Sequence, residues 1–205
     1  MNFNSIFSYD NPMTRFLAKL GKLLWLNILW LITSLPLFTL GASTCALYYT
    51  TLRLVRDEEG YLTREYFHAF RNGFPKASFF FFFIAAVSAV CCTDFFYFGK
   101  SELLALRFLA FLIAGFLLFF LFAAVYLLPL TAQFNNTIGG TFRAALGIAS
   151  QNLHWSFCLL ILNVALPLVI LFRFLPLIVF GPALPVFLQS YLLNRIFKNC
   201  SVNEI

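Results

Sequence analysis

The chain is poor in charge. Asp, Glu, Lys and Arg make up 11% of its 205 residues, and hydrophobic residues make up 61%. Soluble domains contain about 25% charged and roughly 45–50% apolar residues. Both differences indicate that lipid, rather than water, surrounds much of the folded protein. The alternating segments of about ten residues that build a membrane β-barrel are also lacking, so we expect helices.

The sequence also lacks the motifs of enzyme sites. It has no HExxH, no GxSxG, no phosphate-binding loop and no pair of carboxylates at the spacing of a catalytic pair. No acidic residue lies near the middle of a long apolar run, which argues against a carboxylate proton relay. The five cysteines show no CxxC or Cys/His spacing, and His68 and His154 are interpreted as packing residues. We therefore predict no catalytic residue, no metal, no cofactor and no enzymatic activity.

Long runs of Leu and Phe dominate what is present, and Phe alone occurs 29 times. A membrane-spanning helix needs roughly 20 consecutive apolar residues. The runs therefore predict an all-α, polytopic transmembrane helical bundle that forms a single domain, 1–205. We expect about six spans, at residues 23–40, 42–56, 77–98, 103–130, 156–172 and 175–193.

The second span is short. Ala42–Val55 has 14 residues, fewer than a crossing helix needs. It therefore either crosses the membrane or dips in and returns to the same side. Positive charge favours crossing, because loops rich in Lys and Arg stay in the cytoplasm. With a crossing, the basic residues that follow this span share a side with Arg15, Lys19 and Lys22.

Two stretches between spans are polar on one side only. In residues 62–74, apolar side chains recur at helical spacing with basic and polar residues opposite, and Gly73 and Pro75 are expected to end the helix. In residues 138–153, a similar apolar face is interrupted by glycines. Both patterns indicate amphipathic helices. We expect them at the cytoplasmic membrane interface, with docking to a partner protein as the alternative.

The net charge of +6 comes from basic residues at the ends of apolar runs. It therefore indicates topology and contact with anionic lipid rather than nucleic acid. With six spans, three of the 14 Lys and Arg residues face outside and the other eleven face inside. The three outside are Lys100, Arg107 and Arg173. This asymmetry predicts that both termini lie inside.

One short pattern occurs twice. Leu35-Pro36-Leu37 and Gly41 recur 140 residues later as Leu175-Pro176-Leu177 and Gly181, and each precedes a short helix that ends in Arg. The recurrence is either chance or an internal duplication. A duplication would resemble the repeats of transporters, whose broken helices line the substrate site. It would bring Pro36–Gly41 and Pro176–Pro185 together.

The candidate functional residues break apolar helices or add polarity to them. The helix breakers are Pro36, Gly41, Pro129, Pro176 and Gly181. The charged candidates are Arg53, Arg56, Asp57, Arg71, Asp94, Arg107 and Arg143. Tyr48 and Tyr49 lie within the second span, so their hydroxyls need a partner in the protein or water. Asp94 and Arg107 either pair across the outer turn or face the headgroups.

Amides inside or beside the spans form a last group. They are candidates for interhelical hydrogen bonds, or alternatively for the wall of a polar cavity. The group comprises Asn27, Gln133, Asn163, Gln189 and Asn194.

Several short motifs carry a family resemblance. They are Asn11-Pro12, Leu35-Pro36, Gly41–Thr44, Ala46–Tyr49, Leu52–Glu58 and the aromatic helix Tyr66–Phe74. With these motifs the chain resembles, over essentially its full length, the YesL-like family of bacterial membrane proteins, a domain of unknown function. The resemblance implies a multi-span protein of the bacterial cytoplasmic membrane. Such proteins are often encoded beside carbohydrate-uptake genes in Gram-positive bacteria. The resemblance implies no catalytic residues.

Two functions fit these expectations. The first is an accessory component of oligosaccharide uptake that contacts membrane lipids and the permease of a sugar importer. The second is a small transporter or channel with a site at the helices broken by Pro and Gly.

Overall fold

The chain folds into a bundle of helices. The computed structural model describes residues 12–58, 60–100, 103–134, 136–173 and 181–202, and no strand occurs among them. The helices are α1 (Pro12–Ser34), the short 3-10 helix η2 (Leu37–Thr39), α2 (Leu40–Val55), α3 (Leu62–Gly99), α4 (Leu104–Gln133), α5 (Ile138–Gln151), α6 (Leu153–Arg173) and α7 (Ala183–Val202). The predicted all-α helical bundle is confirmed.

Helix α2 lies at the centre of the bundle. Eleven of its 16 residues are buried, and it contacts α1, α3, α4 and α7. Its first turns consist of small residues such as Ala42, Ser43 and Ala46, which let neighbouring helices approach closely. At 1.5 Å per residue it is about 24 Å long, whereas the hydrocarbon core of a bilayer is about 30 Å thick. Because most of its residues are buried, other helices rather than lipid cover most of this short helix.

Three helices are long and apolar enough to cross a membrane. They are α1 within Leu17–Ser34, α3 and α4. Helix α5 and the described start of α6 would together make a fourth crossing, but they are bent by 107° at the break between them. The chain is therefore a membrane protein. Crossing by α2 and the total of six spans stay predictions.

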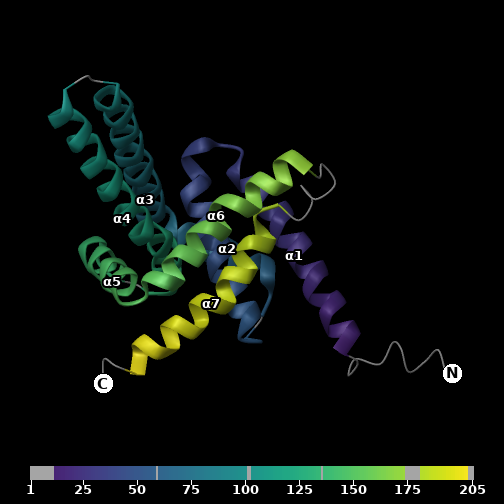
Figure 1. Cartoon of the computed structure of the whole chain (residues 1–205). Coiled ribbons are helices and arrows are strands. Elements are labelled where there is room, and N and C mark those ends of the chain that lie inside the picture. Colours follow the sequence, from purple (N-terminus) through teal and green to yellow (C-terminus); the bar gives the residue numbers. More distant parts are fainter. Residues whose placement is uncertain (1–11, 59, 101–102, 135, 174–180, 203–205) are drawn as a thin grey trace.

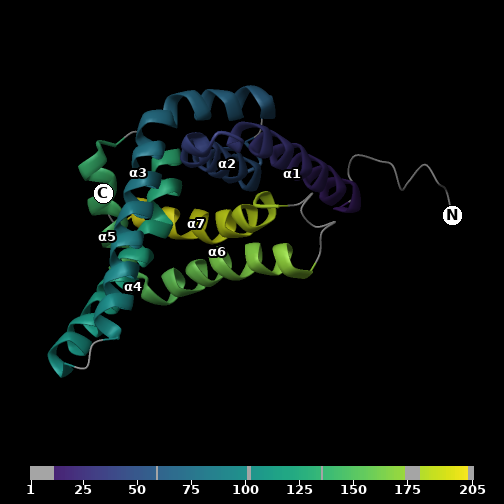
Figure 2. The ribbon, with the colours of Figure 1, turned by 90° about the horizontal axis from the view of Figure 1, so that it is seen from above.

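Helix α3 runs through the position where the sequence predicted an end. Gly73 and Pro75 lie inside it, so that prediction was wrong. A proline in a helix removes one backbone hydrogen bond and often produces a kink without ending the helix. Figure 2 shows such a bend, since the first part of α3 runs across α1 and α2 and the rest turns away along α4. Gly73 fits because a Cβ atom there would lie 3.2 Å from the Cys45 sulfur.

Helices α3 and α4 form a hairpin that projects from the rest of the bundle (Figure 1). Its outer half exposes large apolar side chains, among them Tyr97 (78% exposed), Leu104 (83%) and Phe111 (74%). Apolar faces of this extent mark contact with lipid or with another protein. The outer half of the hairpin is therefore an extended apolar surface that faces the surroundings of the protein.

Helix α5 is the second predicted amphipathic segment. Thr137 caps it, because its hydroxyl accepts a hydrogen bond from the Gly140 backbone N–H at 3.2 Å. Ala145 and Ala149 are buried, and Arg143 is exposed. Packing against α4 therefore stabilises a helix whose glycines alone disfavour it.

Candidate functional site

Two groups of polar side chains contact α2. One lies inside the bundle, where α2 meets α6 and α7. The other lies at the C-terminal end of α2, where α2 meets α1, α3 and α7. Polar groups among so many apolar residues are costly unless they are hydrogen-bonded. Each group is therefore a candidate for a specific role.

The first group is the polar seam, which consists of Tyr48, Thr51, Asn163, Gln189 and Ser190. The Tyr48 hydroxyl donates a hydrogen bond to Gln189 Oε1, and Asn163 Nδ2 donates to the same oxygen at 3.3 Å. The hydroxyls of Thr51 and Ser190 lie 2.9 Å apart. Of the five, all but Asn163 are buried. The seam thus connects α2, α6 and α7 through side chains alone.

One atom of the seam has no partner among the residues that the structure describes. Gln189 is 1% exposed, and its Nε2 atom makes no hydrogen bond. Its Oε1 atom already accepts from Tyr48 and Asn163, so turning the amide over would orphan the oxygen instead of the nitrogen. An unsatisfied buried donor costs about 1–3 kcal/mol. The polar seam therefore contains one buried hydrogen-bond donor that does not help to hold the helices together.

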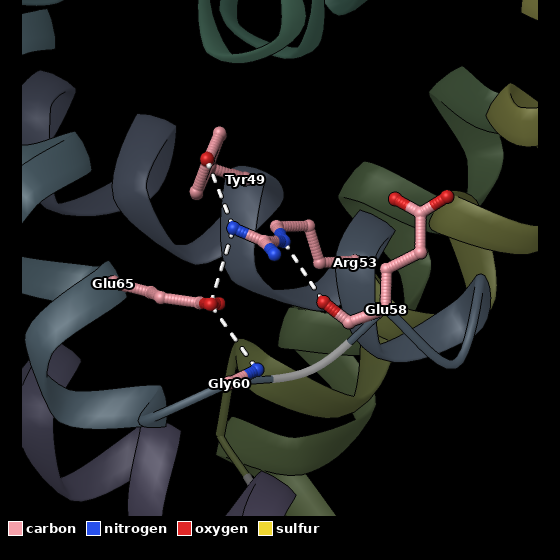
Figure 3. A network of polar contacts seen from close by, with 5 residues as sticks. All are labelled: Tyr49, Arg53, Glu58, Gly60 and Glu65. Carbon is pink, nitrogen blue, oxygen red and sulfur yellow. Dashed lines mark hydrogen bonds and ion pairs between the residues drawn. The ribbon is translucent and has the colours of Figure 1, made fainter.

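The second group is the junction network, which consists of Tyr49, Arg53, Glu58, Gly60 and Glu65 (Figure 3). The Arg53 guanidinium lies 3.1 Å from Glu65 Oε1 and donates to the Tyr49 hydroxyl at 3.4 Å and to the Glu58 carbonyl at 3.0 Å. Glu65 Oε1 also accepts from the Gly60 backbone N–H at 3.1 Å. The network ties the end of α2 to the start of α3.

Two further contacts extend from the same end of α2. Lys19 of α1 forms a salt bridge with Asp57 at 2.9 Å, and Arg56 Nε donates to Asn194 Oδ1 of α7 at 2.9 Å. Asp57 has a positive φ of 56°, the conformation in which many helices end. Partly exposed ion pairs contribute only about 0–1 kcal/mol each. Their combined effect is to fix how four helix segments meet.

The structure joins several candidate residues as the sequence predicted. The hydroxyls of Tyr48 and Tyr49 both have protein partners. Asn163, Gln189 and Asn194 make hydrogen bonds between helices. Thr51, Ser190 and Glu65 were not among the residues predicted from the sequence. Thr51 and Ser190 have short side chains, and Glu65 lies in a polar stretch, so their contacts cannot be predicted before the neighbouring helix is known.

Gly41 has a packing role. A Cβ atom on Gly41 would lie 2.5 Å from the Ala77 carbonyl oxygen and 2.7 Å from Phe81 Cβ. Only glycine therefore allows the start of α2 to lie directly against α3. Ser78 of α3 adds a hydrogen bond to the Phe38 carbonyl at 3.2 Å.

Other candidates stand apart from both groups. Pro36 precedes η2, and Pro129 is buried within α4. Salt bridges between described residues join Lys19 to Asp57 and Arg53 to Glu65, and none joins Asp94 to Arg107. Pairing of those two across the outer turn is thus not observed. Pro176 and the second Leu-Pro-Leu triplet lie outside the described residues, while Gly181 precedes α7.

Arg71 lies in a groove on the surface of α3. The groove, which we name the Arg71 groove, has a volume of about 560 Å³. The groove is lined by Phe67, Phe70, Arg71, Phe74 and Pro75.

No metal site emerges from the described part of the chain. Within it, no group of three or more His, Cys, Asp or Glu side chains is arranged to hold a metal ion.

Comparison with known sequences adds a family. Residues 23–95 match the family described as "protein of unknown function, DUF624", which confirms the YesL-like resemblance over that segment. The matched segment includes α2, the junction network and most of α3. No curated protein and no solved structure matches the chain.

Proposed function

We propose that the protein is an accessory component of bacterial carbohydrate uptake. The proposal starts from the match of residues 23–95 to the DUF624 family. In this proposal it lies in the cytoplasmic membrane with both termini inside and contacts the permease of an oligosaccharide importer. The carbohydrate context comes from the YesL-like resemblance. The exposed apolar surface of the α3–α4 hairpin supports the proposed contact.

The observation that carries the proposal is the projecting α3–α4 hairpin. Its outer half packs mainly on itself, while Phe108 and Phe111 are 64% and 74% exposed. Between transmembrane helices, affinity comes from close van der Waals packing and hydrogen bonds. A hairpin that stands away from its own bundle (Figure 1) can lie along a second membrane protein without rearrangement.

Site-specific photo-crosslinking in a bacterium that expresses the full chain tests this surface. A photoreactive phenylalanine analogue replaces Phe111 of α4. We expect an adduct with an importer permease, identified by mass spectrometry of the cross-linked peptide.

The matched control places the same analogue at Ile32 of α1, which is 60% exposed but lies away from the hairpin. We expect no permease adduct from position 32. The proposal is contradicted if position 111 yields no permease adduct, or if both positions yield the same one.

A second candidate function, a small transporter or channel, is favoured by the polar seam. Helix α2, which contains Gly41, and helix α7, which follows Gly181, meet there, and α7 carries the Gln189 amide. Flux through liposomes that contain the purified protein tests this function, and Gln189→Leu should abolish the flux. Absence of flux for sugars and for ions contradicts it.

A further inference from the structure

The Arg71 groove combines aromatic rings with one cationic group. Its five residues lie three and four positions apart on α3, so they share one face of the helix. Phe67 is 46% exposed, and Pro75 lies inside the helix at the other end of the groove. The groove therefore lies where the amphipathic part of α3 passes into its long apolar part.

Within the described part of the chain, Arg71 makes no hydrogen bond or ion pair. Other basic residues nearby are engaged, since Arg53 contacts Glu65 and Lys76 Nζ donates to the Asn136 carbonyl at 3.0 Å. Arg64, two helical turns before Arg71, is also exposed. The guanidinium of Arg71 thus has its full set of donors available beside an apolar surface.

The charge around the groove favours an anion. Arg64, Arg71 and Lys76 are cationic, and the one carboxylate between them, Glu65, is already occupied by Arg53 and the Gly60 N–H. A planar guanidinium matches a phosphate through two parallel hydrogen bonds. Aromatic rings are favoured at the level of lipid headgroups, and basic residues at a membrane surface attract anionic lipid.

We propose that the Arg71 groove binds the headgroup of an anionic phospholipid. Arg71 holds the phosphate, and Phe67 and Phe74 contact the glycerol and the upper acyl chains. The site is independent of the proposed function, because it requires neither a permease nor transport.

Lipid binding to the purified, delipidated full chain in detergent tests the proposal. The probes are phosphatidylglycerol and phosphatidylcholine with the same acyl chains, and native mass spectrometry measures the bound lipid. We expect phosphatidylglycerol to bind more tightly. Arg71→Gln should lower its affinity about fivefold, close to what one basic residue contributes at an anionic surface, and leave phosphatidylcholine binding unchanged.

Two further variants make the result specific. Arg71→Lys keeps the charge but not the two-pronged geometry, so its affinity should fall between those of the wild type and Arg71→Gln. Arg143→Gln, which removes an exposed arginine from α5, should bind as the wild type does. Unfolding temperatures should be equal, since Arg71 is exposed.

Three outcomes would overturn the site. They are unchanged phosphatidylglycerol affinity in Arg71→Gln, an equal loss in Arg143→Gln, and full competition by inorganic phosphate. The last would show that the groove recognises a free anion and not a lipid.

Discussion

Tyr48 and Gln189 are joined by a hydrogen bond across 141 positions of the sequence, inside an otherwise apolar bundle. The bond connects the buried helix α2 to α7 and brings Asn163 of α6 to the same oxygen. The side-chain amide of Gln189 on α7 thus contacts both α2 and α6.

The Tyr48–Gln189 pair should be energetically coupled. Tyr48→Phe and Gln189→Leu each remove one partner, so the double variant should lose less stability than the sum of the two single losses. We expect a coupling free energy of about 0.5–1.5 kcal/mol, the range of hydrogen bonds between membrane helices. Unfolding in mixed micelles measures it, and strict additivity would show that the two side chains act independently.

Gly41→Ala should destabilise the bundle. The added methyl group would overlap the Ala77 carbonyl oxygen, and such overpacking costs about 1–3 kcal/mol. Gly147→Ala on α5 is the matched control, because no atom lies within 4 Å of its Cβ position. It should be neutral or stabilising by up to about 1 kcal/mol. Equal effects at both positions would refute the close contact between α2 and α3.

Glu65→Gln should loosen the connection between α2 and α3. The variant loses the ion pair with Arg53 while keeping an oxygen for the Gly60 N–H. We expect a loss of about 1 kcal/mol or less that shrinks at high salt. Limited proteolysis in the segment 56–61 should become faster. Arg64→Gln is the control, and faster cleavage there too would assign the effect to net charge.

The topology is testable at the two ends of α3. In a cysteine-free background, Tyr61→Cys and Lys100→Cys introduce exposed thiols on either side of the apolar part of this helix. A membrane-impermeant maleimide added to intact cells should label position 100 and not position 61, as expected if basic loops stay inside. Labelling of position 61 from outside would reverse the proposed orientation.

Sequence patterns were sufficient for the class of protein and for most helices. Long Leu and Phe runs predict membrane helices because hydrocarbon excludes unsatisfied backbone groups. The spacing of apolar residues in 138–153 predicted α5 despite its glycines. These features are local, so each can be recognised from a short stretch of chain.

Pro75 shows where local patterns fail. The residue type predicts a break, but whether a helix ends or bends there depends on what packs around it. In this fold, contacts such as Trp25 Nε1 to Thr63 Oγ1 at 3.0 Å hold the first part of α3 across α1. The helix therefore bends and continues.

The sequence by itself determined that this is an all-helical membrane protein, because composition and periodicity decide which solvent each segment prefers. Only the tertiary structure decided that the short α2 lies at the centre and that Tyr48 meets Gln189. The physical reason is that a hydrogen bond needs its two atoms within about 3 Å. For residues so far apart in the chain, the packing of whole helices decides that distance.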